Sequence, residues 1–113
     1  APGAHVNAAG GNHWQRREVD EDTVTRADVI VVDDVDQAKA ECGDLLWLEA
    51  RGSFRWDMAH ELQEVVAGRV KGRPSSQSIT LFESMGVALE DIAAAQLVYN
   101  KAKEQGIGQE LPF

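Results

Sequence analysis

The apolar run at residues 29–32 limits what this chain can fold into more than any other feature. Four β-branched residues, Val29-Ile30-Val31-Val32, follow one another with no polar residue between them. A strand with apolar side chains on both faces has to be covered on both faces, as strands of a parallel sheet usually are. The run therefore predicts a strand over residues 28–33 in a sheet with helices on either side.

Two further runs predict the neighbouring strands. Residues 4–9 are mostly small and end at Gly10-Gly11, which indicates a tight turn or a close approach of the backbone to another group. Residues 78–82 read Ser-Ile-Thr-Leu-Phe. Strands that alternate with helical segments favour a three-layer α/β fold with a short, mainly parallel sheet. The length of 113 residues suits a single domain over residues 1–113.

Acidic residues and glycines mark the ends of the expected helices. One helix is predicted from Asp34 to Cys42, with Gly43 as its C-terminal cap. Another is predicted to begin at Asp57 and to end at Gly68. Thr23 is expected to cap a brief turn before Arg26, and residues 45–51 fit either a strand or a helix.

A long helix is predicted from Val87 to Gln105. Its first part, residues 87–99, is apolar nearly all round, so we expect this helix to be buried on more than one side. A short sheet offers too little surface to cover it. The sequence therefore predicts a homodimer or a larger assembly with residues 87–99 in the interface.

Charge and composition exclude several classes of function. Lys and Arg total 11 against 19 Asp and Glu, and a net charge of −8 is unsuited to holding phosphate backbones, so no nucleic-acid partner is expected. Cys42 is the single cysteine and cannot form an intrachain disulfide, which fits a reducing compartment. No apolar run approaches the roughly 18 residues of a membrane span, and the first residues have neither the basic region nor the apolar region of a signal peptide. We expect a cytoplasmic protein with no membrane association.

Metal binding and thiol chemistry have little support in the sequence. His5, His13 and His60 lack the spacing of a zinc-binding helix, so no metal site is predicted. The acidic run Asp33-Asp34-Val35-Asp36 could hold a cation, but capping of the following helix is the favoured interpretation. Nothing in the sequence marks Cys42 as a reactive thiolate.

Four blocks of sequence resemble consecutive segments of one enzyme family. They are Asn7-Ala8-Ala9-Gly10-Gly11-Asn12 with the following Arg16-Arg17-Glu18-Val19-Asp20; residues 26–33; residues 61–69, ELQEVVAGR; and residues 79–91, ITLFESMGVALED. In this order they are similar to the ornithine cyclodeaminase/mu-crystallin family. The resemblance implies the C-terminal portion of a longer enzyme: the second half of a Rossmann-like domain plus the C-terminal helix. Members of the family are typically dimers or larger.

The resemblance also implies a cofactor, NAD or NADP, and substrates among amino acids, their cyclic imines or related keto acids. However, no GxGxxG motif follows a strand, since Gly10-Gly11 precedes Asn12. Binding of the cofactor by this chain alone is therefore doubtful. Two functions stay open. The chain is part of, or a truncated descendant of, an imine reductase or amino-acid dehydrogenase, or it is a free-standing, non-catalytic module that binds a ligand or a partner.

Three residues match cofactor-binding positions of the family, and no catalytic residue is predicted. Asn12 stands where cyclodeaminases carry an aspartate, and its neutral amide favours reduction over deamination. The alternative is a left-handed turn at Asn12. Arg16 lies at a basic position near the cofactor, or is a surface residue paired with Glu18 or Asp20. Ser84 can bond the nicotinamide carboxamide, or it caps the helix that follows.

Overall fold

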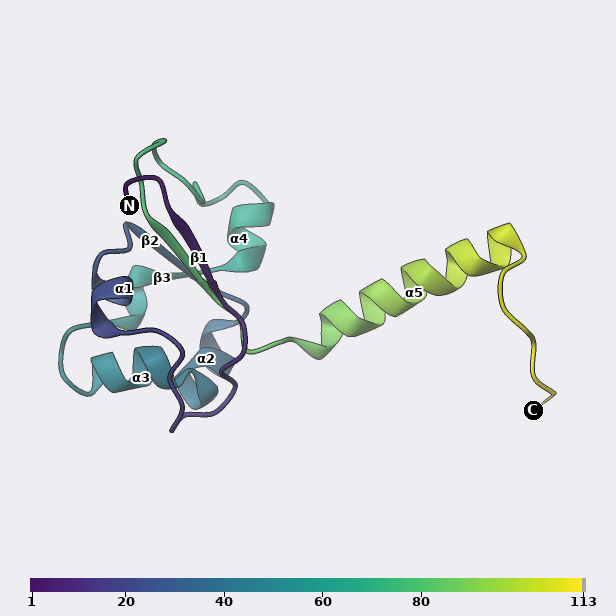
Figure 1. Ribbon diagram of the computed structural model, residues 1–113, viewed down its shortest axis with the longest axis horizontal. Coiled ribbons are helices and arrows are strands. Elements are labelled where there is room, and N and C mark those ends of the chain that lie inside the picture. Colours follow the sequence, from purple (N-terminus) through teal and green to yellow (C-terminus); the bar gives the residue numbers. More distant parts are fainter. Residues whose placement is uncertain (113) are drawn as a thin grey trace.

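Four parallel strands form one sheet in the computed structural model, which describes residues 1–112 (Figure 1). The strand order is β1-β4-β2-β3, and the bounds are β1 His5–Ala8, β2 Val29–Val32, β3 Ala59–Glu61 and β4 Thr80–Glu83. The three strands expected from the sequence are confirmed. The apolar β2 lies between β4 and β3, and all four of its residues are buried.

Helices cover the two faces of this sheet, which confirms the three-layer α/β fold. On one face lie α1 (Glu21–Thr25), α2 (Val35–Glu41) and α3 (Gly43–Glu49). Their side chains pack on the strands in one core, which includes Val24, Ala38, Leu45, Leu48, Ile30, Val32 and Leu81. On the other face lies α4 (Leu62–Val66), which lines a small hollow together with Val31 and Phe82.

The helix predicted to begin at Asp57 is wrong over its first turns. A 3₁₀ turn, η1 (Trp56–Met58), is followed by β3, which pairs with the free edge of β2 in the register Ile30↔Ala59. The helix α4 begins only at Leu62, where the Glu64 side chain accepts the Glu61 amide and Glu61 in turn caps the first turn. The neighbouring strand supplies backbone partners for residues 59–61 that the local sequence does not indicate.

Two predicted caps also differ from the structure. Gly43 begins α3 instead of capping α2, and residues 45–49 are helical. A Cβ atom at Gly43 would lie 2.0 Å from the Arg16 carbonyl oxygen, so this glycine lets the chain after β1 pack directly on α3. The cap of α1 is Asp20, whose carboxylate accepts the Thr23 amide at 2.9 Å, and not Thr23 itself.

The long helix α5 (Ala88–Gln105) has the predicted extent and ends at Gly106, a glycine with φ +65°. The predicted burial of this helix is wrong within the described chain, because none of its residues is buried there. The helix projects away from the sheet (Figure 1), and its apolar side chains are exposed: Leu89, Ile92, Leu97, Val98 and Tyr99. Leu89 lines a hollow with α4, and the segment after Gly106 turns back beside Tyr99, but neither covers these side chains. The apolar surface that the sequence predicts to lie in an interface is therefore open in this chain.

Candidate functional site

The candidate residues lie at one edge of the sheet. Ser84 follows β4, Asp33 follows β2, and the loop of residues 9–19 follows β1. The strands are parallel and adjacent, so their carboxyl ends meet at the same edge, where open α/β sheets bind ligands. The Ser84 amide donates to the Ala8 carbonyl at 2.8 Å and joins the ends of β4 and β1.

Ser84 is held by Asp33. The Ser84 hydroxyl donates to Asp33 Oδ2 at 2.9 Å, and the Gly86 amide donates to the same oxygen at 2.8 Å. The helix-capping interpretation of Ser84 is therefore wrong: Val87 is the N-cap of α5 and makes no side-chain cap bond. The capping prediction for the acidic run is confirmed at Asp34, which accepts the Gln37 amide at 2.8 Å.

Asn12 is exposed in the loop after β1. Among the described residues only glycines have positive φ, so the left-handed turn interpretation of Asn12 is wrong. The close approach predicted at the glycine pair is made by Glu18. The Gly10 amide donates to Glu18 Oε2 at 2.7 Å, and a Cβ atom at Gly10 would lie 2.1 Å from Glu18 Oε1.

Arg16 is exposed in the same loop, next to the start of α3. Within residues 1–112 no ion pair links Arg16 to Glu18 or Asp20. The structure thus brings Ser84 and Asp33 into contact, whereas Asn12 and Arg16 share only their edge of the sheet. Sequence analysis missed the partnerships of Asp33 and Glu18. The contact of Glu18 with Gly10 had one sequence signal, namely an acidic residue a few positions after two adjacent glycines.

Two buried carboxyl groups underlie this loop. Asp44 on α3 is 4% exposed and accepts the amides of Glu18 at 3.0 Å and Val19 at 3.2 Å. Glu83, the last residue of β4, is 2% exposed, and its Oε1 has no hydrogen-bond partner. Burial raises the pKa of Glu83 to about 8, and the charges of Asp44 and Glu18 add to the shift.

Cys42 lies beside Glu83, with its Sγ 3.9 Å from Glu83 Oε2. Burial raises the pKa of the Cys42 thiol to about 12, and the nearby Glu83 carboxyl adds to this shift. The thiol therefore holds its proton at neutral pH. This is the opposite of the electropositive, accessible setting that makes a cysteine nucleophilic.

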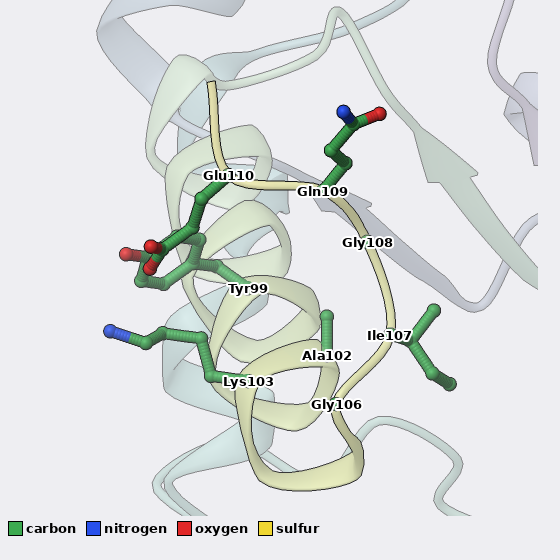
Figure 2. Close-up of a pocket in the computed structure, with 8 residues that line it drawn as sticks. All are labelled: Tyr99, Ala102, Lys103, Gly106, Ile107, Gly108, Gln109 and Glu110. Carbon is green, nitrogen blue, oxygen red and sulfur yellow. The ribbon is translucent and has the colours of Figure 1, made fainter. Parts of the chain in front are cut away.

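Two hollows on the surface differ in whether residues at the carboxyl ends of the strands line them. One, of about 320 Å³, is lined by Asp33 and Asp34, by α4, and by Val87, Leu89 and Glu90 at the start of α5. The other, of about 440 Å³, is formed where the segment after Gly106 turns back along α5 (Figure 2). Ser84, Asn12 and Arg16 line neither hollow. The first hollow adjoins the candidate site only through Asp33, the hydrogen-bond partner of Ser84.

In the part of the chain that the structure describes, no group of three or more His, Cys, Asp or Glu side chains is placed to hold a metal ion. No helix in residues 1–112 has both the length and the apolar character needed to cross a membrane.

The chain is similar in sequence to several known enzymes. The sequence pattern of the ornithine cyclodeaminase/mu-crystallin family matches residues 1–106. A Δ1-pyrroline-2-carboxylate reductase of Bacillus cereus is 35% identical over 112 residues, which are 98% of this chain and 34% of that protein. The ketimine reductase mu-crystallin of Rattus norvegicus is 40% identical over 100 residues, 88% of this chain and 29% of that protein.

Solved structures show the same fold. The Δ1-pyrroline-2-carboxylate reductase of Thermococcus litoralis, in complex with NADH and L-proline, matches with a TM-score of 0.86 and 39% identity. This match covers 97% of the present chain and 34% of the reductase chain. An archaeal alanine dehydrogenase dimer with bound NAD matches with a TM-score of 0.81 and 35% identity over 99% of this chain and 35% of that one.

The present chain spans about a third of the length of these relatives. Its partial Rossmann-like fold is confirmed by the structural matches. The extent of the sequence match, together with these structures, shows that the chain belongs to the ornithine cyclodeaminase/mu-crystallin family.

Proposed function

We propose that this chain is the C-terminal, nicotinamide-binding portion of an NAD(P)-dependent imine reductase or amino-acid dehydrogenase. The observation that carries the proposal is the Ser84 hydroxyl, held by Asp33 at the carboxyl ends of two adjacent parallel strands. Support comes from relatives that are named as reductases or dehydrogenases, and from two that were solved with NADH or NAD.

The described residues fit one end of such a cofactor. The Ser84 hydroxyl proton is committed to Asp33, so its lone pairs remain able to accept an amide N–H of a carboxamide group. When bound, the cofactor supplies or accepts the hydride, and the protein orients the reactants. The role of Ser84 would be to hold the plane of the nicotinamide ring against the substrate.

The pyrophosphate end of the cofactor does not fit the glycine pair. The Gly10 amide, which could otherwise donate to a phosphate oxygen, already donates to the Glu18 carboxylate. A carboxylate in this position would also repel a phosphate group. The proposal therefore requires that the pyrophosphate bind to a different segment of a larger protein.

Asn12 decides between the two reaction types of the family. It is exposed at the same edge of the sheet, and its neutral amide neither takes nor gives a proton at neutral pH. Release of ammonia from ornithine requires acid–base help at the substrate carbon, whereas hydride transfer to an imine requires orientation. Asn12 and the exposed Arg16 would then contact the bound cofactor or substrate by hydrogen bonds.

The test is an assay of two proteins, this chain alone and the protein encoded by the whole reading frame that contains it. With NADH or NADPH and Δ1-pyrroline-2-carboxylate, the whole protein should oxidise the cofactor, as followed by absorbance, and the chain alone should not. The whole protein should release little ammonia from L-ornithine. Turnover by the isolated chain, or efficient release of ammonia, would contradict the proposal. A reading frame that opens at Ala1 would favour the alternative, a free-standing binding module.

We also propose that the chain assembles as a homodimer or larger through residues 87–99. The apolar side chains of α5 are exposed, with Leu89 at 72% and Ile92 at 67%. A contiguous apolar helix face of this kind is a typical protein–protein interface. A similar structure, the archaeal alanine dehydrogenase, is a dimer, which supports the proposal.

A further inference from the structure

Asp33 has no part in the function proposed above except to contact Ser84. We infer that Asp33 is a positioning residue that makes Ser84 a hydrogen-bond acceptor toward the bound ligand and so selects a neutral ligand group that carries N–H donors. This inference rests on the proposed function, because it concerns the ligand group that Ser84 meets.

The hydrogen bond between the two side chains fixes what Ser84 can offer to a ligand. A serine hydroxyl has one proton and two lone pairs, and an ionised carboxylate only accepts. The Ser84 hydroxyl donates its proton to Asp33 Oδ2, and the two oxygen atoms are 2.9 Å apart. Ser84 can therefore offer only lone pairs to a third group. Without Asp33 the hydroxyl would rotate freely and could donate as readily as accept.

The carboxylate itself is fixed by its surroundings. Asp33 Oδ2 also accepts the Gly86 amide at 2.8 Å, and the Gly86 carbonyl accepts Gln37 Nε2 at 3.0 Å. Gln37 in turn is in the first turn of α2, which Asp34 caps. Asp33 therefore has little freedom to turn away from Ser84.

The second oxygen of Asp33 places negative charge beside Ser84. Asp33 Oδ1 is buried without a hydrogen-bond partner, so none of the neighbouring groups disperses its share of the negative charge. An anionic ligand group next to Ser84 would be repelled by the lone pairs of the hydroxyl and by the negative charge of Asp33. A carboxamide, which is neutral and carries two N–H donors, satisfies the site, whereas a methyl ketone offers only a carbonyl oxygen that Ser84 cannot bond.

The test compares two cofactors that differ in this one group. Dissociation constants of NADH and of reduced 3-acetylpyridine adenine dinucleotide are measured by calorimetry on the whole protein that contains this chain. The acetyl group replaces the amide nitrogen with a methyl group. We expect NADH to bind about tenfold more tightly, the size of one hydrogen bond to an uncharged group.

Three variants locate the cause of this preference. Asp33→Ala should reduce it to about twofold or less, because the freed hydroxyl can donate to the acetyl oxygen. Asp33→Asn should keep most of it, since the amide oxygen can accept from both Ser84 and Gly86. The matched control is Asp28→Ala, which removes a 2.8 Å bond to the Ile79 amide at the opposite ends of the same two strands. This control should not change the preference.

The outcomes separate the inference from the proposed function. If NADH binds and the preference is unchanged in Asp33→Ala, or falls equally in Asp28→Ala, the inference on Asp33 is wrong and the proposed function stands. If the whole protein does not bind NADH, both are wrong. Loss of the preference in Asp33→Ala, together with its retention in Asp33→Asn and Asp28→Ala, supports the inference.

Discussion

At the scale of single residues, this chain buries acidic groups where their charge is poorly compensated. Glu83 is the clearest case, because it lies on the core face of the central strand β4 with one oxygen unpartnered. Its neighbours Asp44 and Glu18 are also acidic, and the nearby thiol of Cys42 stays protonated. The folded state therefore favours the protonated form of Glu83.

Stability should fall with rising pH because of Glu83. Its pKa is raised from 4.5 to about 8 in the folded state, so between these values the folded chain holds a proton that the unfolded chain has lost. The free energy of unfolding should decrease as pH rises across this window and level off above it. Glu83→Gln should remove this decrease and stabilise the chain at pH 8 by an amount on the order of 2–5 kcal/mol.

Urea unfolding at pH 4.5 and at pH 8.5 provides the measurement for Glu83→Gln. Glu49→Gln, an exposed position on α3, is the control and should leave the pH dependence as it is. Equal pH dependence in the Glu83→Gln variant and the unaltered chain would show that Glu83 ionises normally.

Gly43 is the second residue-scale test. A side chain there meets the carbonyl oxygens of Arg16, Trp14 and His13, all of which are backbone atoms. Gly43→Ala should therefore destabilise the chain by about 1–3 kcal/mol through overpacking, although alanine is the better helix former. Thermal unfolding followed by circular dichroism measures the loss. Glu49→Ala at the other end of α3 should cost far less, and equal losses in both variants would contradict the packing argument.

At the scale of elements, short helices are held by their caps. The helix α2 has only seven residues, and its N-terminus depends on the bond from the Gln37 amide to Asp34. Since Gln37 also reaches the Gly86 carbonyl, this cap connects α2 to the segment between β4 and α5. The segment that carries Ser84 and Gly86 is therefore held in place by contact with the N-terminal turn of α2.

Asp34→Ala should destabilise the chain by about 1 kcal/mol, because one helix amide loses its partner. Asp36→Ala in the same turn removes an exposed ion pair with Lys39 and should cost about 0.5 kcal/mol or less. Chemical unfolding of the two variants side by side measures the difference. A loss at Asp36 as large as that at Asp34 would mean that charge at the helix start, and not the cap bond, is responsible.

At the scale of the whole molecule, the chain has a small covered body and a long uncovered helix (Figure 1). The core lies between the sheet and α1–α3, with Cys42, Phe54 and Met85 added by connecting segments, whereas α5 has no buried residue. An 18-residue helix with this much open apolar surface is stabilised chiefly by packing against something else. Assembly of the chain should therefore depend on α5.

Leu97→Lys should weaken assembly, because it places a charge on the apolar surface of residues 87–99. Gln105→Lys, at an exposed position of α5 outside residues 87–99, is the control and should leave assembly unchanged. Light scattering at micromolar concentration should give at least twice the mass of one chain for the unaltered protein and for Gln105→Lys. A monomer mass for the unaltered protein would refute the proposed assembly.

The sequence by itself determined the features that depend on local patterns. The run of residues 29–32 predicts a doubly covered strand, and the long apolar segment ending at Gly106 predicts the extent of α5. Asp34 caps α2 as its place before a helix suggested. Each of these three features follows from a local side-chain pattern or from a cap within a few residues, and none needs a distant partner.

The tertiary structure decided everything that depends on residues far apart in the chain. The strand β3 exists because β2 offers an edge, and Gly43 is required because a loop some thirty positions earlier lies on it. The sequence motif pointed to Ser84, but its contact with Asp33, 51 positions away, appears only when β2 and β4 lie side by side. Packing brings these groups together, and no local pattern encodes which distant strand becomes a neighbour.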